Sequence, residues 1–268
     1  MKQVSKPLKP KILIHKQEDF AGMRKAGLLA AQVLDFIGEF VQPGVTTEEL
    51  NERCHEMIIK NGAIPAPLNY KGFPKSICTS VNHVVCHGIP GEKRLQNGDI
   101  LNIDVTVIVE GWYGDSSRMY WVGNNTSIKA KKLTQVTFDA LMMAIEKVKP
   151  GAHLSIIGKT IEQYVTKQGF SVVKDFCGHG IGRTFHAEPN VLHYYHPHGP
   201  DVTLEEGMFF TIEPMVNAGG YATKVMPDGW TAITKDRSLS AQFEHTVGVT
   251  KDGVEIFTLS PADKYFPK

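Results

Sequence analysis

The feature that most constrains the fold is a weak internal repeat. Segment 42–62 opens with Gln-Pro-Gly and ends with Lys-Asn-Gly, and segment 149–169, offset by 107 residues, opens with Lys-Pro-Gly and ends with Lys-Gln-Gly. The stretch from Gly98 to Asp104 aligns with the stretch from Gly207 to Glu213 at an offset of 109. Two matches at nearly one offset predict a duplicated unit with two related halves. Each half then offers one carboxylate at the same place, Asp104 and Glu213.

Helices and strands are predicted within both halves. Apolar residues at helical spacing predict a helix over 18–41, and a capping-box sequence at 46–49 opens a second helix that ends near residue 62. Further helices are expected over 128–148 and 154–168. The strand-like segments are 100–109, 112–122, 207–216, 230–234 and 242–249. Two helices followed by strands, twice over, indicate an α+β domain with pseudo-twofold halves.

Composition narrows the class of protein. With 268 residues and 42% hydrophobic residues, the chain can bury one sizeable core, and we expect a single domain over 17–268. The net charge of +1 argues against a nucleic-acid binder, and no apolar run is long enough to span a bilayer. The four cysteines form no Cys-x-x-Cys pair, so we expect reduced thiols and a cytoplasmic protein. Residues 1–16 are basic and are expected to be a flexible arm.

Two aspartates are predicted to share one face of a hairpin. If Glu110-Gly111 is a two-residue turn, Asp104 faces Ser117, and Asp115 lies diagonally across from Asp104 on the same face. Two such carboxylates repel each other unless a cation or a proton lies between them. The alternative is that Asp115 belongs to a polar loop and Asp104 caps another element.

Three more polar residues occur in apolar or glycine-rich surroundings. Glu213 and Glu244 interrupt strand-like runs, and His179 lies within a Gly-His-Gly-Ile-Gly sequence. A buried carboxylate is costly without a partner. Four carboxylates and one imidazole suit a pair of divalent cations such as Mn, Fe, Co or Zn. Bridging carboxylates would hold such ions about 3.5 Å apart around a shared water.

Seven short motifs occur together and in order. They are Val-Cys-His-Gly-Ile-Pro at 85–90, Asn-Ile-Asp-Val-Thr at 102–106, Gly-Asp-Ser-Ser at 114–117, Gly-His-Gly-Ile-Gly at 178–182, Phe-His-Ala-Glu-Pro at 185–189, Thr-Ile-Glu-Pro-Met at 211–215 and Phe-Glu-His-Thr at 243–246. Together they resemble type I methionine aminopeptidases of peptidase family M24, over roughly residues 17–259. The resemblance implies the pita-bread fold, in which helices cover a curved antiparallel sheet. It also implies that the five metal ligands are Asp104, Asp115, His179, Glu213 and Glu244.

The length of one segment indicates the subtype. Only 30 residues separate Glu213 from Glu244, too few for the helical insert of type II enzymes, and the arm contains no cysteine for the zinc-binding extension of eukaryotic cytosolic type I enzymes. The resemblance therefore points to the short bacterial form, or to an organellar relative without its transit peptide.

The resemblance implies release of the initiator methionine from nascent proteins when the second residue is small and uncharged. Asp115 and Glu244 would bridge two cations, with Asp104 completing one and His179 and Glu213 the other. Glu213 would also shuttle a proton. His186 would bind the carbonyl oxygen of the scissile bond, and His87 its amide.

A small apolar pocket for methionine is also implied. Family positions place Tyr70, Phe73, Cys78, Phe185 and Trp230 around it, although ordinary core packing is an equal alternative for each aromatic ring. The chain departs from the family pattern at Pro67, where a cysteine is frequent, and at Phe73, where a tyrosine is usual. These departures concern the shape of the pocket and not the chemistry.

Several other interpretations stay open. A proline-specific relative, of the prolidase or aminopeptidase P kind, shares the fold and similar ligands, but normally carries an additional N-terminal domain. A non-enzymatic homologue would keep the fold as a ribosome- or protein-binding module. His193, His196 and His198 resemble a third metal site, but Pro197 and Gly199 favour an exposed loop. We expect a monomer that contacts the ribosome exit through the basic arm, and no DNA or membrane partner.

Overall fold

The structure, a computed structural model, describes residues 11–200, 202–264 and 266–267. Most of the predicted flexible arm therefore lies outside the described residues. The last residues of that arm are described, and there His15 is buried, with its N–H donating to the carbonyl of Gly207 at 2.8 Å. The imidazole of His15 stacks on Phe209 with ring centroids 4.2 Å apart. This part of the arm packs against the body of the protein.

The first half runs from α1 to β5. Its helices are α1 (Asp19–Ile37), the 3₁₀ turn η1 (Gly38–Phe40) and α2 (Thr47–Lys60). After them come β1 (Ile64–Pro65), the 3₁₀ turn η2 (Tyr70–Gly72), β2 (Cys78–Val81), β3 (Val84–Cys86), β4 (Ile100–Val109) and β5 (Trp112–Trp121). The capping box predicted for α2 is present, because the Thr46 side chain accepts from the Glu49 N–H and the Glu49 carboxylate accepts from the Thr46 N–H.

The second half has the same order of two helices followed by strands. It contains α3 (Ile128–Ile145), α4 (Ser155–Lys167), β6 (Ser171–Val172), β7 (Gly178–Gly180), β8 (Ala187–Val191) and β9 (Phe209–Ile212). The remaining strands are β10 (Met215–Asn217), β11 (Thr223–Val225), β12 (Ala232–Thr234), β13 (Ser240–Gln242), β14 (His245–Val249) and β15 (Val254–Ile256). The predicted α+β architecture with two related halves is confirmed.

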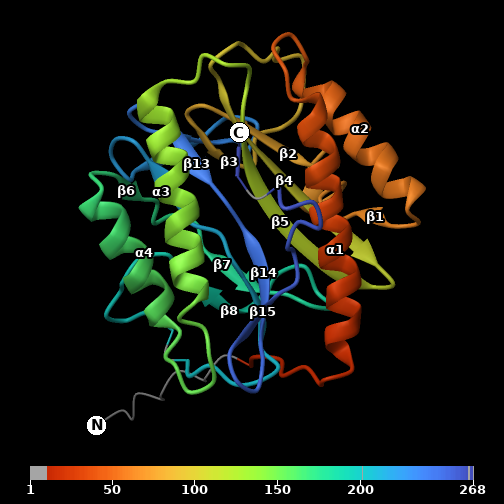
Figure 1. The fold of residues 1–268 in the computed structure, drawn as a ribbon, viewed down its shortest axis with the longest axis vertical. Helices are drawn as coiled ribbons and strands as arrows, with labels where there is room; N and C mark the ends of the chain where they lie inside the picture. The colour runs from red at the N-terminus through yellow and green to blue at the C-terminus, as the bar shows by residue number, and fades with distance from the viewer. Residues whose placement is uncertain (1–10, 201, 265, 268) are drawn as a thin grey trace.

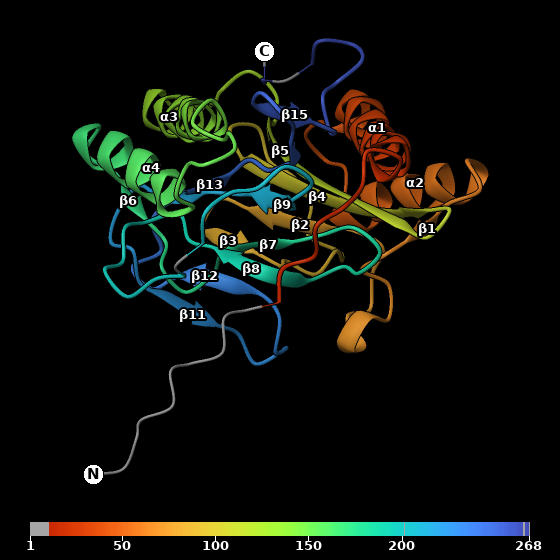
Figure 2. The same cartoon turned by 90° about the horizontal axis from the view of Figure 1, so that it is seen from below.

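The helices of both halves cover one face of the strands. In Figure 1, α1 and α2 lie on one side of the central strands and α3 and α4 on the other, and Figure 2 shows all four on the same face of the strand layer. Each half has its own apolar core. The first gathers buried residues of α1, α2 and β4, such as Leu34, Leu50 and Leu101, and the second gathers residues of α3, α4 and β9, such as Leu141 and Phe210.

The two halves meet where β5 passes β14. Ser117 and Glu244 form an isolated antiparallel bridge, with the Glu244 N–H donating to the Ser117 carbonyl at 3.0 Å. The Thr246 hydroxyl donates to the Asp115 carbonyl at 2.6 Å and accepts from the Asp115 N–H at 3.3 Å. Side-chain hydroxyls therefore replace part of a regular ladder and join one strand of each half.

Three predicted elements differ from the structure at specific residues. The helix expected over 18–41 is α-helical only to Ile37 and ends in the 3₁₀ turn η1. The strand expected over 207–216 is two strands, β9 and β10, because Pro214 has no N–H to continue a ladder. The strand expected over 242–249 is likewise divided into β13 and β14 around Glu244. Among the described residues, no helix is both long and apolar enough to cross a membrane.

Candidate metal centre and active site

The hairpin of β4 and β5 places two carboxylates on one face. Its turn residues Glu110 and Gly111 have φ angles of 50° and 78°, as a two-residue type I′ turn requires. The register pairs Asp104 with Ser117 and Thr106 with Asp115, which confirms the predicted diagonal placement of the two aspartates. Both aspartates line one cavity, so the alternative that they belong to a loop and a cap is wrong.

The second half supplies the other three polar groups. Glu213 directly follows β9 and Glu244 directly precedes β14, while His179 is the central residue of β7. The glycines beside His179 allow the neighbouring strands to approach closely. A Cβ at Gly178 would lie 2.4 Å from the Thr211 carbonyl oxygen, and one at Gly180 would lie 2.1 Å from that of Glu188.

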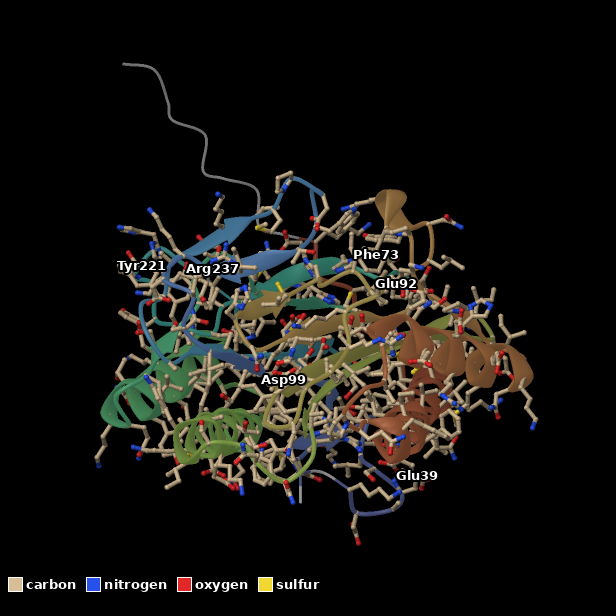
Figure 3. All side chains as sticks on the ribbon, turned by 90° about the horizontal axis from the view of Figure 1, so that it is seen from above. Glu39, Phe73, Glu92, Asp99, Tyr221 and Arg237 are labelled. Carbon is tan, nitrogen blue, oxygen red and sulfur yellow. The ribbon has the colours of Figure 1, made fainter. Side chains whose placement is uncertain are left out.

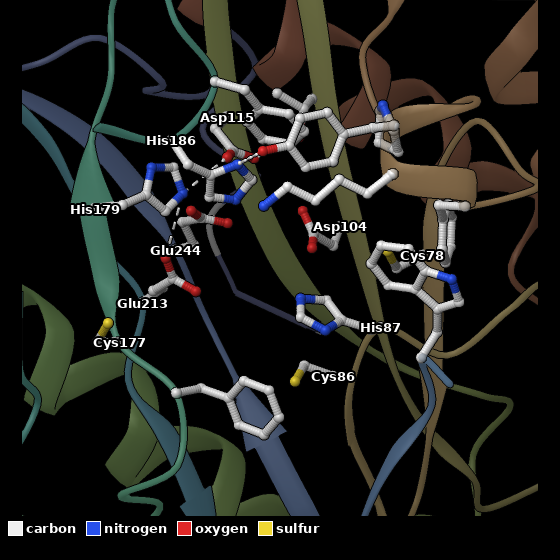
Figure 4. A pocket seen from close by; sticks show the side chains of 18 of the residues that line it. Cys78, Cys86, His87, Asp104, Asp115, Cys177, His179, His186, Glu213 and Glu244 are labelled. Atoms are coloured by element: carbon white, nitrogen blue, oxygen red, sulfur yellow. Dashed lines mark hydrogen bonds and ion pairs between the residues drawn. The ribbon is translucent and has the colours of Figure 1, made fainter. Parts of the chain in front are cut away.

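These groups converge in one cavity (Figure 4). Ligand atoms of Asp115, His179 and Glu244 all lie within 4.8 Å of one another. His179 Nε2 lies 3.5 Å from Asp115 Oδ2 and 3.7 Å from Glu213 Oε1. Asp104 enters the same space from β4. The chain thus brings four carboxylates and one imidazole together from both halves.

Burial and mutual repulsion disfavour the charged form of these carboxyls. Burial, together with the negative charge of Asp115, raises the pKa of Glu213 to about 7, although the positive charge of His179 lowers it. Burial and neighbouring carboxylates raise the pKa of Asp104 and of Glu244 well above the ordinary range. For His179, burial lowers the pKa, but the hydrogen bond that the imidazole donates to Asp115 and the charges of Glu213 and Asp115 outweigh it, so the pKa is raised.

The donor set fits divalent cations. The Nδ1 of His179 lies 3.1 Å from the Gly180 carbonyl oxygen, to which it can donate, and this leaves the Nε2 lone pair facing the carboxylates. The Thr106 hydroxyl donates to Asp115 Oδ1 at 2.7 Å, which leaves Oδ2 toward His179. Oxygen donors with one imidazole are the set that Mn, Fe, Co and Zn accept, and a cation would also remove the repulsion among the carboxylates.

Two histidines line the same cavity as the carboxylates. His186 Nδ1 is 2.9 Å from the Tyr70 hydroxyl, and burial together with the charge of His179 lowers the pKa of His186 to about 4. Its ring centroid is 4.2 Å from that of His179. His87 has a left-handed backbone, with φ at 55°, and burial lowers the pKa of its imidazole. Both imidazoles are therefore neutral near pH 7.

The cavity has a volume of about 650 Å³ and an apolar side. Phe73 packs edge-on against Trp230 at 5.2 Å, and Tyr70 packs against Phe185 at 4.8 Å. Figure 3 shows Phe73 on the side of the strands away from the helices. The cavity is lined by all twelve site residues predicted from the sequence, which are Tyr70, Phe73, Cys78, His87, Asp104, Asp115, His179, Phe185, His186, Glu213, Trp230 and Glu244.

Some residues that support the site were not found from the sequence. The Thr211 hydroxyl accepts from the His179 N–H at 3.0 Å and donates to Glu213 Oε1 at 2.8 Å, so it orients both groups. Gln242 Nε2 donates to Glu213 Oε2 at 3.3 Å. The two-residue spacing between Thr211 and Glu213, on one face of a strand, was a signal that could have identified this threonine.

The interpretation of His193 as part of an exposed loop is wrong. His196 and His198 are exposed, but His193 is fully buried, and its Nε2 accepts from the Glu213 N–H at 3.0 Å. His193 Nδ1 has no hydrogen-bond partner, and burial lowers the pKa of this imidazole to about 3. His193 therefore supports the main chain of Glu213 as a neutral ring. No metal-ligand cluster in the described part of the chain includes any of the three histidines.

Comparison with known proteins agrees with this geometry. The sequence profile of metallopeptidase family M24 matches residues 21–251. The methionine aminopeptidase of Rickettsia prowazekii is 62% identical over 96% of this chain and 98% of its own length. The crystal structure of methionine aminopeptidase from Rickettsia prowazekii superimposes with a TM-score of 0.90, covering 93% of this chain and 100% of that one. A prolidase from Pyrococcus furiosus, at 21% identity and a TM-score of 0.73, covers 92% of this chain and 65% of its own; this likeness shows the fold alone.

Carboxylates and an imidazole gathered in one cavity of a pita-bread fold are typical of a metallopeptidase, and the profile match over residues 21–251 shows that the chain belongs to metallopeptidase family M24. Within that family it belongs with the methionine aminopeptidases. Its sequence identity to the Rickettsia prowazekii protein, over nearly the full length of both chains, shows this. The segment between Glu213 and Glu244 carries four short strands and no helix, in agreement with the type I pattern.

Proposed function

We propose that the chain removes the N-terminal methionine from new polypeptides whose second residue is small and uncharged, with two divalent cations bound at the carboxylate cluster. The observation that carries this proposal is the convergence of Asp115, His179 and Glu244 within 4.8 Å in the cavity, in a chain 62% identical to a methionine aminopeptidase. The ion itself is Co, Mn, Fe or Zn.

The five polar groups would hold the cations in two sets. Asp115 and Glu244 would serve both cations, with Asp104 beside one of them and His179 and Glu213 beside the other. The diagonal of Asp104 and Asp115 on the hairpin and the nearness of His179 to Glu213 support this division. Bound cations supply Lewis acidity, which polarises the scissile carbonyl and makes water acidic enough to attack near neutral pH.

The chain's own groups move the protons. Glu213 takes the proton of the attacking water and passes it to the leaving amine. His186 donates from Nε2 to the oxygen that develops negative charge. This role is supported by the Tyr70 hydroxyl, which can donate to Nδ1 of His186 and leave the ring proton on Nε2. His87 hydrogen-bonds the scissile amide.

The apolar side of the cavity receives the methionine side chain. Tyr70, Phe73, Cys78, Phe185 and Trp230 line it, and an unbranched thioether fills such a space well. Pro67 lines the same cavity beside Tyr70, so the departures from the family pattern at Pro67 and Phe73 affect the width of the pocket.

A metal-reconstitution assay tests the proposal. Protein stripped with chelator is assayed for release of methionine from Met-Ala-Ser, with Mn, Co, Fe or Zn added back singly. We expect activity to return with at least one ion and to be lost again in Asp115→Asn, which keeps the size of the side chain. Ala-Pro serves as the competing substrate. Cleavage of Ala-Pro in place of Met-Ala-Ser would identify a proline-specific enzyme, and folded protein that is inactive with every ion would identify a binding module.

The cellular setting forms part of the proposal. The chain acts as a cytoplasmic monomer near the ribosome exit, where its substrate emerges, and the basic arm with Lys11 and Lys16 contributes to that contact. Deletion of residues 1–16 should therefore weaken cosedimentation with ribosomes. Unchanged cosedimentation would remove the arm from the proposal, and a dimer in sedimentation analysis would contradict the monomer.

A further inference from the structure

One positively charged residue at the cavity has no role in the chemistry proposed above. Lys71 belongs to η2, and it is the only Lys or Arg among the residues that line the cavity. It is exposed, and its ammonium lies 5.2 Å from the ring centroid of Tyr70. Among the described residues, no carboxylate lies within 4.0 Å of this ammonium. The charge is therefore available to a group that enters the cavity.

The backbone around Lys71 is held in a defined turn. Lys71 has φ 49° and ψ 28°, in the left-handed region, between Tyr70 and Gly72. The Asn69 N–H donates to the Phe73 carbonyl at 2.8 Å, and the Phe73 N–H donates to the Tyr70 carbonyl at 2.9 Å. This short turn fixes where the side chain of Lys71 starts, while its methylene groups leave the ammonium free to reach a ligand.

The position of Lys71 relative to His186 decides which part of a substrate it meets. Lys71 follows Tyr70, whose hydroxyl contacts His186, and its charge is one of the causes that lower the pKa of His186. In the proposed function, the methionine side chain occupies the apolar side of the cavity, and the scissile bond lies between His186 and the carboxylate cluster. The residues after the scissile bond must then leave toward the open mouth. The second residue is small, so the first long side chain there belongs to the third residue.

Other charges at the cavity have the opposite sign. Apart from the carboxylates of the metal centre, the acidic lining residues are Asp175 and Glu188. Asp175 accepts from the Thr223 hydroxyl at 2.6 Å, and Glu188 accepts from the Asn190 N–H at 3.1 Å. Each is engaged by a neighbour within the protein. Among the described lining residues, Lys71 is thus the one Lys or Arg side chain that can attract negative charge outside the metal centre.

We propose that Lys71 is a specificity-determining residue whose ammonium binds an acidic side chain at the third residue of the substrate. This inference rests on the proposed methionine aminopeptidase function. The expected size of the preference is small, because an ion pair in contact with solvent is screened. For exposed pairs we expect a two- to fivefold higher kcat/KM, carried mainly by KM, for an aspartate than for an asparagine at that position.

Three tetrapeptides that differ only at the third residue test the inference. The metal-loaded protein is assayed on Met-Ala-Asp-Leu, Met-Ala-Asn-Leu and Met-Ala-Lys-Leu at low and at high salt. We expect the order Asp, Asn, Lys in kcat/KM, with differences that shrink at high salt. Lys71→Met should remove the difference between Asp and Asn, and Lys71→Glu should reverse the order of Asp and Lys.

The matched control is Lys75→Met. Lys75 is close in sequence, but it pairs with Glu48 at 2.6 Å and does not line the cavity, so this variant should keep the preference for aspartate. Equal values for the Asp and Asn peptides in the wild-type protein, or an unchanged ratio in Lys71→Met, would overturn the role of Lys71 while leaving the proposed function intact. Failure to cleave any of the three peptides would instead contradict the proposed function.

Discussion

At His186, one hydrogen bond determines which ring nitrogen carries the proton. The low pKa of about 4 keeps the imidazole neutral near pH 7, so it can donate from only one nitrogen. The Tyr70 hydroxyl, 2.9 Å from Nδ1, can donate to it and thereby hold the proton on Nε2. The capacity of His186 to stabilise negative charge on the substrate then depends on a tyrosine that touches no reacting atom.

Replacement of this tyrosine tests the argument. Tyr70→Phe keeps the ring that lines the methionine pocket and removes only the hydroxyl. Loss of a hydrogen bond worth about 1–1.5 kcal/mol predicts a fall in kcat of roughly five- to tenfold, with KM for Met-Ala-Ser little changed. Tyr195→Phe, on an exposed tyrosine outside this cavity, is the matched control and should behave as wild type. A rise in KM at constant kcat would show that Tyr70 serves binding alone.

At the scale of elements, the contact between β5 and β14, which we call the seam, carries candidate metal ligands from both halves of the chain. Asp115 lies on β5 and Glu244 immediately precedes β14, and the Thr246 hydroxyl bonds both main-chain groups of Asp115. The Ser116 hydroxyl donates to the Glu244 carbonyl at 2.7 Å. Because these hydroxyls join the strands, the separation of the two carboxylates is set by the packing of one half against the other.

Thr246→Val should weaken both the fold and the metal centre. The valine keeps the shape but leaves a buried N–H and a buried carbonyl of Asp115 without this partner, at a cost of about 1–3 kcal/mol. We expect a lower free energy of unfolding by denaturant and weaker metal binding in calorimetry. Thr137→Val is the matched control, since the Thr137 hydroxyl, also fully buried, donates only to a carbonyl of its own helix. Equal losses in both variants would contradict a special role for the seam.

The sequence predicts those elements whose signal is local. The Glu110-Gly111 turn set the register of a long hairpin, and with it the faces of Asp104 and Asp115. The three-residue strands β7 and β11 have too few residues for a periodic pattern, and their pairing depends on neighbours distant in sequence. The break at Pro214 could have been predicted, because proline cannot continue a ladder.

For the candidate site, eight of the twelve predicted residues lie within short motifs, and the other four, Tyr70, Phe73, Cys78 and Trp230, came from family positions. Only the folded chain shows all of them in one cavity. The residues that sequence reasoning missed act through contacts made only in the folded chain. His193 is buried beneath Glu213, although Pro197 and Gly199 favoured an exposed loop for the whole segment. Nothing in the sequence distinguishes Lys71 from other lysines, and only the fold places it on the cavity wall.

At the scale of the whole molecule, the metal centre couples stability to pH. The pKa of Glu213 is raised from 4.5 to about 7, and the pKa values of Asp104 and Glu244 are raised well above their ordinary values. A carboxyl with a raised folded-state pKa stabilises the fold fully below its unfolded pKa, and this contribution is lost as pH rises through the folded pKa. In the metal-free protein, Glu213 therefore favours folding at pH 4.5 and ceases to do so above about pH 7.

Other titrating groups change the free energy of unfolding with pH in the opposite direction. The contribution of Glu213 is therefore obtained by comparing the wild-type protein with a variant that lacks this carboxyl. Burial lowers the pKa of His193 and of His245 to about 3, and such histidines cost stability as pH falls below their unfolded value of 6.5. Glu213→Gln removes the titrating carboxyl and leaves these histidines in place. The free energy of unfolding of the wild-type protein minus that of Glu213→Gln, measured with chelator by denaturant titration, should decline between pH 4.5 and pH 7.

The decline should be at most on the order of 3 kcal/mol, which corresponds to the full shift of the Glu213 pKa. Metal binding requires the ionised carboxylates, so added metal should stabilise the wild-type protein more at pH 7.5 than at pH 5.5. In Glu213→Gln the gain from metal should be smaller at pH 7.5 than in the wild-type protein. A difference that stays flat from pH 4.5 to 7 would show that Glu213 is already ionised in the metal-free fold, and that the repulsion at this centre is relieved by a partner other than a cation.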